Sequence, residues 1–158
     1  MNVTVLCVGR LREKYWSDAC AEYLRRLTRF GRTEVTEVPD LPEPKNGSEA
    51  DSRKVMDREA AALMKYVQPG DRVVCLCIGA PLWDSPALAE KVRRADMEGK
   101  RLVFVIGGSL GLGEEILRRA DEKMSMGRMT FPHQLARVML LEQLYRAAKI
   151  NSGERYHK

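Results

Sequence analysis

Two loops late in the chain carry the residues best suited to hold a ligand through their main chain. The first, residues 107–113 (GGSLGLG), has four glycines in seven residues and follows the apolar run 102–106. Glycine permits positive φ angles and lets a ligand approach the backbone closely, which a solvent-exposed turn seldom requires. The second loop, residues 127–132 (GRMTFP), carries apolar side chains that suit a pocket lining better than a surface connection. These loops are therefore the first candidates for a binding site.

The segment after the second loop, residues 134–150, is predicted to be a helix that is apolar around most of its circumference. Counted at 100° per residue, Glu142, Arg146 and Lys149 share one narrow polar stripe. Such a helix must be buried on more than one side, and in a chain of this length we expect the second burying surface to be another subunit. Arg137 falls opposite the polar stripe. Its charge needs a partner, either a carboxylate in the dimer interface or a group of a ligand.

Composition indicates one ordinary globular domain, residues 1–158, of which 44% are apolar and 31% charged. The net charge of +5 permits a nucleic-acid partner without requiring one. No apolar run approaches the length that spans a membrane, and the first residues lack the basic start and cleavage site of a signal peptide. We therefore expect a cytoplasmic protein with no membrane partner.

The four cysteines, Cys7, Cys20, Cys75 and Cys77, agree with a reducing compartment. Cys75 and Cys77 are spaced for the same face of a strand within an apolar run, which is typical of small core residues. A zinc site would need two further ligands, and the chain has neither CxxC nor paired-histidine spacing. No metal is expected.

The chain alternates apolar runs of strand length with segments of helical periodicity. Strands are expected at 3–8, 33–38, 72–78, 102–106 and 123–126. Helices are expected at 11–30, 48–68 with Ser48 as its N-cap, 85–99 with Ser85 as its N-cap, 114–120 and 134–150. This order predicts an α/β fold, a mostly parallel sheet with helices on both faces. Ligands of such sheets bind beyond the carboxyl ends of the strands, which here are the loops after Ile78, Ile106 and Met126.

Common glycine-loop functions do not fit the spacing. From Gly108 the pattern is G-x-x-G-x-G, the reverse of the dinucleotide fingerprint, and it follows the fourth strand instead of the first. No Gly-Lys-Ser/Thr follows to cradle phosphates, and neither a Gly-x-Ser-x-Gly elbow nor a carboxylate pair indicates a hydrolase. The residues alone predict an α/β dimer that binds a small, partly apolar ligand in its late glycine-rich loops.

Four motifs together are more specific. They are residues 106–111 (IGGSLG), 129–134 (MTFPHQ) with Arg137, 141–147 (LEQLYRA), and the terminal Tyr156-His157-Lys158. Over essentially its whole length the sequence resembles the ribosomal RNA large-subunit methyltransferase H family, the pseudouridine N3 methyltransferases of the SPOUT superfamily. It departs from the family at Met126-Gly127, where Leu-Ser is expected. The glycine removes a hydroxyl contact to the cofactor but leaves the backbone amides.

The resemblance implies a SPOUT-type fold whose C-terminal helix, from Gln134, threads a trefoil knot. It implies a homodimer that methylates N3 of a pseudouridine in large-subunit (23S) rRNA, with the assembled ribosome as substrate. The implied cofactor is S-adenosyl-L-methionine. By position, its binding residues would be Leu76, Gly108, Gly127, Arg128, Met129, Thr130, Phe131 and Pro132.

The terminal residues Tyr156, His157 and Lys158 are the catalytic candidates, although a frayed end is the default for such a segment. N3 of a uracil-type ring becomes a good nucleophile as its proton leaves, so a histidine that accepts the proton or a cation that stabilises the anion would help. Tyr156 could stack on the flipped base. The resemblance to dimeric enzymes of this family also implies that the tail completes the active site of the partner subunit, which we adopt as a hypothesis. The alternative is a non-catalytic ribosome-associated protein that uses only its basic face to bind RNA.

Overall fold

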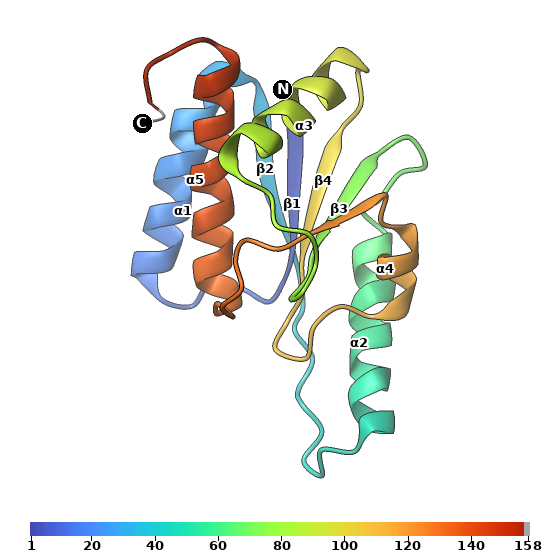
Figure 1. The fold of residues 1–158 in the computed structure, drawn as a ribbon. Helices are drawn as coiled ribbons and strands as arrows, with labels where there is room; N and C mark the ends of the chain where they lie inside the picture. Colours follow the sequence, from blue (N-terminus) through green and yellow to red (C-terminus); the bar gives the residue numbers. More distant parts are fainter. Residues whose placement is uncertain (157–158) are drawn as a thin grey trace.

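The computed structural model describes residues 1–156, in which a central sheet separates two layers of helices (Figure 1). The strands are β1 (Asn2–Val8), β2 (Arg32–Val38), β3 (Arg72–Leu76), β4 (Leu102–Ile106) and β5 (Glu122–Met124). The helices are α1 (Lys14–Leu27), the short 3₁₀ turn η1 (Thr28–Phe30), α2 (Glu49–Met64), α3 (Ser85–Met97), α4 (Glu114–Arg119) and α5 (His133–Asn151).

The sheet has the strand order β2-β1-β4-β3-β5, and every neighbouring pair is parallel. The predicted parallel α/β sheet is thus confirmed. β2 lies at an edge, as the polar and apolar alternation of its sequence indicates. β1 lies between β2 and β4, where Val5 is opposite both Val35 and Phe104.

Alternate residues of the strands enter two separate cores. On β1, Val3, Val5 and Cys7 face the layer formed by α1, α3 and α5. Leu6 and Val8 face the opposite layer, formed by α2 and α4. Because successive side chains of a strand point to opposite faces, strands with apolar residues at both sets of positions must be covered on both sides. The helices on both faces in Figure 1 meet this requirement.

α5 lies between α1 and α3 and packs on the sheet beneath them (Figure 1). Leu140, Leu141 and Leu144 are fully buried within this single chain. A second subunit is therefore not needed to bury these three leucines, because α1 and α3 cover them. The half-buried stripe of Glu142, Arg146 and Lys149 is the predicted polar one.

Several element ends differ from the predicted ones for local reasons. β3 stops at Leu76 instead of Ile78, and the chain then turns at Gly79, whose φ is 75°. The N-cap of α3 is Asp84 instead of Ser85, since its carboxylate accepts a hydrogen bond of 2.8 Å from the amide of Ala87. Ser48 caps α2 as predicted. The trefoil knot implied by the resemblance stays a prediction.

Within the described part of the chain, no helix combines the length and the apolar character that crossing a membrane requires.

Candidate functional site

A cavity of about 760 Å³ opens at the carboxyl ends of β3, β4 and β5, where parallel sheets bind their ligands. Its walls are residues 76–78, 106–112, 124–126 and 129–133, together with Leu117 and Ala136. The three loops predicted to form a site therefore meet, although they are widely separated in the sequence. This volume lies within the range of pockets that enclose a cofactor-sized molecule.

Six of the eight predicted cofactor residues line the cavity: Leu76, Gly108, Met129, Thr130, Phe131 and Pro132. Gly127 and Arg128 do not. Gly127 shapes the loop, because its carbonyl accepts a 2.7 Å hydrogen bond from the hydroxyl of Ser125 and a Cβ on it would contact Phe131. The side chain of Arg128 is exposed to solvent.

The glycine-rich loop folds back into a tight turn that presents main chain to the cavity. The amide of Gly111 donates to the carbonyl of Gly108 over 3.1 Å, and Gly111 has a φ of +93°, which residues with side chains rarely adopt. Ser109 extends outward and donates its hydroxyl hydrogen to the carboxylate of Glu43. A Cβ on Gly107 would lie 2.9 Å from the backbone of Gly111, so the turn can close only with a glycine there.

Gly108 serves a different purpose from the expected one. A Cβ at this position would point to Val8 and Glu59, 3.2 and 3.1 Å away, and neither residue lines the cavity. The missing side chain therefore leaves room for packing behind the turn, whereas we expected it to leave room for the ligand. The turn still brings the backbone of Gly108 to the pocket wall.

His133 is a pocket residue to which the sequence analysis assigned no binding or catalytic role. It lines the cavity at the first turn of α5 and is half-buried. Burial, and then the nearby Arg137, lower the pKa of His133 against the opposing effect of Asp40. The imidazole is therefore uncharged at neutral pH and offers a nitrogen that can accept a proton. Its position directly after the apolar loop was the signal that could have identified it.

Arg137 is completely buried, with 1% of its surface exposed. Its guanidinium donates to the carboxylate of Glu37 and, over 3.0 Å, to the carbonyl of Gly9. Both partners belong to the same chain, so neither of the two expected partners, an interface carboxylate or a ligand, is needed to explain this charge. Arg137 ties the start of α5 to the ends of β1 and β2.

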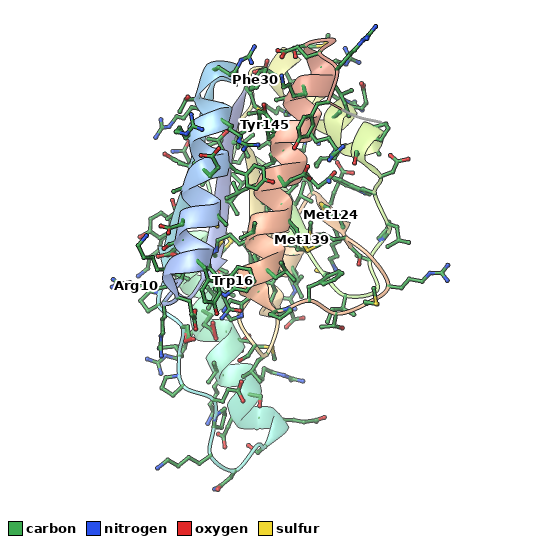
Figure 2. The ribbon with its side chains drawn as sticks, turned by 90° about the vertical axis from the view of Figure 1, so that its left-hand side faces the viewer. Arg10, Trp16, Phe30, Met124, Met139 and Tyr145 are labelled. Atoms are coloured by element: carbon green, nitrogen blue, oxygen red, sulfur yellow. The ribbon has the colours of Figure 1, made fainter. Side chains whose placement is uncertain are left out.

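The described part of the tail packs on its own subunit and not in its pocket. The ring of Tyr156 meets that of Tyr145 at 5.0 Å between centroids, and the guanidinium of Arg146 lies 4.7 Å from the Tyr156 centroid. Tyr156 also donates to Glu142 over 3.3 Å. Figure 2 shows Tyr145 between α1 and α5, near Phe30 and above Met139 and Met124. His157 and Lys158 lie outside the described residues.

The cysteines are free, and Cys75 is buried as predicted, as are Cys7 and Cys20. Cys77 differs, since it is half-buried and lines the cavity. Burial raises the pKa of Cys77, which keeps it a thiol and suits an apolar wall. Residues 1–156 contain no group of three or more side chains of the kinds that hold a metal ion.

Comparison with known proteins agrees with this geometry. Residues 1–157 match the family model described as a predicted SPOUT methyltransferase. Among solved structures, a probable methyltransferase from Bordetella pertussis Tohama I has a TM-score of 0.58 at 16% identity, covering 93% of this chain and 94% of that one. A probable methylase family protein from Haemophilus influenzae Rd KW20 has a TM-score of 0.56 at 15% identity, covering 99% and 70%. The fold and the matched family define the class as the SPOUT methyltransferases.

Closer relatives narrow the class. A protein of Clostridium novyi (strain NT) is 45% identical over the full length of both chains. One of Oenococcus oeni is 43% identical over all of this chain and 99% of its own. One of Bifidobacterium animalis subsp. lactis is 44% identical over the whole of both. All three are named Ribosomal RNA large subunit methyltransferase H, and the chain belongs to their family.

Proposed function

We propose that this protein binds S-adenosyl-L-methionine in the cavity and methylates N3 of a pseudouridine in large-subunit (23S) rRNA, with the assembled cytoplasmic ribosome as substrate. The observation that carries the proposal is the meeting of three strand-end loops in one cavity, lined by six of the eight residues predicted to bind the cofactor. The relatives named for large-subunit rRNA methylation support the choice of substrate.

The cavity wall fits the proposed cofactor. Leu76, Met129 and Phe131 offer apolar surface for the adenine base, and the tight turn at Gly108 offers main-chain donors and acceptors for its polar edges and the ribose. When bound, the cofactor would supply a methyl group carried on a positively charged sulfur. This sulfur is a good leaving group, so the methyl transfer does not require a metal. The chain then has to bind the target base, exclude water and take up the N3 proton.

The tail and His133 are the groups available for that proton. We assign the catalytic role to Tyr156, His157 and Lys158, in which an imidazole can accept the proton and a cation can stabilise the developing anion. Tyr156 does not line the cavity of its own subunit, which favours action on the partner's cavity. His133 already lines the wall as a neutral imidazole and is a second acceptor within reach of a bound base.

A homodimer would bring a partner's tail to the cavity, and exposed apolar side chains near the cavity suit such contact. Ile78 and Met129, which line the cavity, are 79% and 76% exposed, and Leu82 on the same loop as Ile78 is 55% exposed. Large apolar side chains gathered around a pocket mark an interaction surface. We assign this surface to the dimer contact. Ile78→Asp combined with Met129→Asp should give a folded monomer in analytical ultracentrifugation, and an unchanged dimer would contradict the assignment.

Ligand binding can be tested by thermal unfolding with S-adenosylhomocysteine, the demethylated cofactor. A ligand that binds only the folded state adds about 2.7 kcal/mol at 100 times its dissociation constant, so the unfolding temperature should rise by several degrees. Adenosine monophosphate serves as the control. No shift with either form of the cofactor would favour the alternative of a non-catalytic ribosome-associated RNA-binding protein.

The role of the tail can be tested by mixing two variants that should be inactive. One is Gly108→Val, whose side chain would collide with Val8 and Glu59 and displace the turn from the cavity wall, and the other is a chain that ends at Glu154. Mixed dimers would contain one site with both defects and one with neither, so methylation of ribosomes from a deletion strain should partly return. If activity stays absent although subunit exchange is confirmed, the tail does not act on the partner's site.

A further inference from the structure

Glu59 is a buried acid whose Oε2 atom has no hydrogen-bond partner within residues 1–156. It lies on α2, in the layer opposite α5, and only 6% of its surface is exposed. Its Oε2 atom is buried and has no donor within the part of the chain that the structure describes. Burying a polar atom without a partner costs roughly 1–3 kcal/mol, so nearly all such atoms in proteins are paired. An exception beside a ligand pocket requires a physical explanation.

The carboxyl group of Glu59 lies directly behind the turn of the glycine-rich loop. Its Oε2 is 3.1 Å from the point where a Cβ of Gly108 would be, and Val8 closes the same space from β1. The other side of Gly108 forms the cavity wall. Glu59 and the cavity therefore contact opposite sides of the same backbone segment. A displacement of the carboxyl group should therefore alter the cavity wall, and a ligand that moves the wall should alter the surroundings of Glu59.

The end of the glycine-rich loop is fixed to the same helix. A Cβ on Gly113 would lie 2.4 Å from the carbonyl oxygen of Met56 and 2.8 Å from the Cβ of Ala60, both on α2. The start of α4 is thus pressed against the helix that carries Glu59. Displacement of the turn has to occur at Gly108–Gly111, between this fixed end and β4.

The charges around Glu59 favour its neutral form. Burial and then repulsion from Asp40, in the segment after β2, raise the pKa of Glu59 to about 7. Beyond Asp40 lie His133 and Arg137 of α5, and Arg137 is already paired with Glu37 of β2. Glu43 of the same segment as Asp40 is engaged by Ser109. No cation in the described chain is paired with Glu59.

We infer that Glu59 is a positioning residue of the cofactor pocket: its protonated carboxyl supports the Gly108 turn from behind, and loss of that proton displaces the turn and weakens binding of an adenosyl ligand. The inference rests on the proposed function, because it takes the cavity to be the cofactor site. An ionised carboxylate at this place has no counter-charge in the part of the chain that the structure describes and would draw water or backbone amides toward it. The turn at Gly108 is backbone that the carboxyl group of Glu59 rests against.

The test is calorimetric titration of the full-length protein with S-adenosylhomocysteine from pH 5.5 to pH 8.5. If only the protonated form binds well, the dissociation constant of the wild type should rise about tenfold between pH 6 and pH 8, following the protonated fraction. Glu59→Gln keeps the shape and cannot ionise, so its affinity should stay high and flat across the same range. Any dependence that remains in this variant reports His133.

Two further variants make the outcome specific. Asp40→Asn removes the repulsion on Glu59 and should move the midpoint of the affinity loss to lower pH without abolishing it. Asp57→Asn, an exposed acid two residues before Glu59 on α2, should leave the wild-type profile unchanged. If Glu59 has only a structural role, Asp40→Asn should leave the midpoint of the affinity loss where it is in the wild type.

The outcomes separate this inference from the proposed function. Ligand binding that is equally strong at all pH values in the wild type, or a pH profile that Glu59→Gln shares with it, would overturn the role of Glu59 and leave the cofactor pocket standing. Absence of binding at every pH would overturn both. If Glu59→Gln does not fold, the pH profile of the wild type and the midpoint of Asp40→Asn still test whether Glu59 controls ligand affinity.

Discussion

Arg137 and Glu59 are two buried ionisable side chains near the carboxyl end of β1, and they differ in whether their charge has a partner of opposite sign. The two terminal nitrogens of Arg137 donate to Glu37 and to the carbonyl of Gly9, while its buried Nε has no partner among the described residues. The Oε2 of Glu59 has no partner among the described residues and rests against the turn at Gly108. A paired buried charge fixes elements to one another, whereas an unpaired one can respond to pH. The comparison identifies Arg137 as an anchor of the fold and Glu59 as an adjustable support of the pocket.

The largest expected effect concerns the paired charge. Glu37→Ala leaves Arg137 buried with the carbonyl of Gly9 as its remaining partner, which should cost about 3–5 kcal/mol of unfolding free energy in urea denaturation. Arg137→Met should cost less, because the side chain of Glu37 is 32% exposed and can be hydrated. A larger loss of unfolding free energy for Arg137→Met than for Glu37→Ala would contradict this prediction.

The unpaired charge should behave in the opposite way. The folded carboxyl of Glu59 keeps its proton to about pH 7, while the unfolded one ionises near the ordinary glutamate pKa of 4.5. Unfolding therefore releases a proton in this window, and the free energy of unfolding falls as the pH rises from about 4.5 to about 7. Glu59→Gln removes this loss, so the variant should be more stable than the wild type at pH 8, by about 1–3 kcal/mol. The advantage should shrink toward pH 5, and a destabilised variant at pH 8 would contradict the prediction.

A double-mutant cycle sharpens the link between Glu59 and the turn. Gly108→Ala places a methyl group 3.1 Å from Oε2 of Glu59 and should cost about 1 kcal/mol of stability. Glu59→Ala makes room, so the two changes together should be less damaging than their sum, with a coupling of at least about 0.5 kcal/mol. Gly127→Ala is the control, since its Cβ would have an ordinary 3.7 Å contact with Phe131. Additive effects would show that the two residues do not press on each other.

The smallest effect is expected at the tail. Tyr156→Phe removes one hydrogen bond of 3.3 Å to Glu142 and keeps the packing on Tyr145, so the free energy of unfolding should change by about 0.5 kcal/mol or less. If the tail acts in catalysis, the rate of ribosome methylation should fall clearly although the free energy of unfolding hardly changes. Equal small changes in both would indicate that Tyr156 only covers α5.

Most of the fold could be predicted from the sequence because its strands are short apolar runs separated by clear turn and cap residues. The loops of the pocket were predictable for the same reason, since the carboxyl ends of parallel strands converge. The environment of α5 was not, because its periodicity shows that it must be buried but cannot show by what. The partner of Arg137 lies 100 residues away in sequence, and no local pattern identifies Glu37.

The burial of Glu59 could not be predicted from the sequence either. Glu59 stands beside Asp57 and Arg58 in a charged stretch of α2, where exposed acids are common. Only the fold decides that this one carboxyl faces inward, toward a glycine in a loop that follows a distant strand. The direction of Gly108 was misjudged for the same reason, because glycine alone does not indicate which side of the backbone needs the space.

The place of β1 within the sheet has a consequence for how the chain folds. β1 pairs with β2, the next strand in sequence, and with β4, which begins only at Leu102. The unit β1-α1-β2 can form from nearby contacts, whereas the pairing of β1 with β4 must first overcome the entropy of closing a long loop. Folding should therefore be limited by the arrival of β4. The amides of Val5 and Phe104 should exchange with solvent only when the whole molecule unfolds.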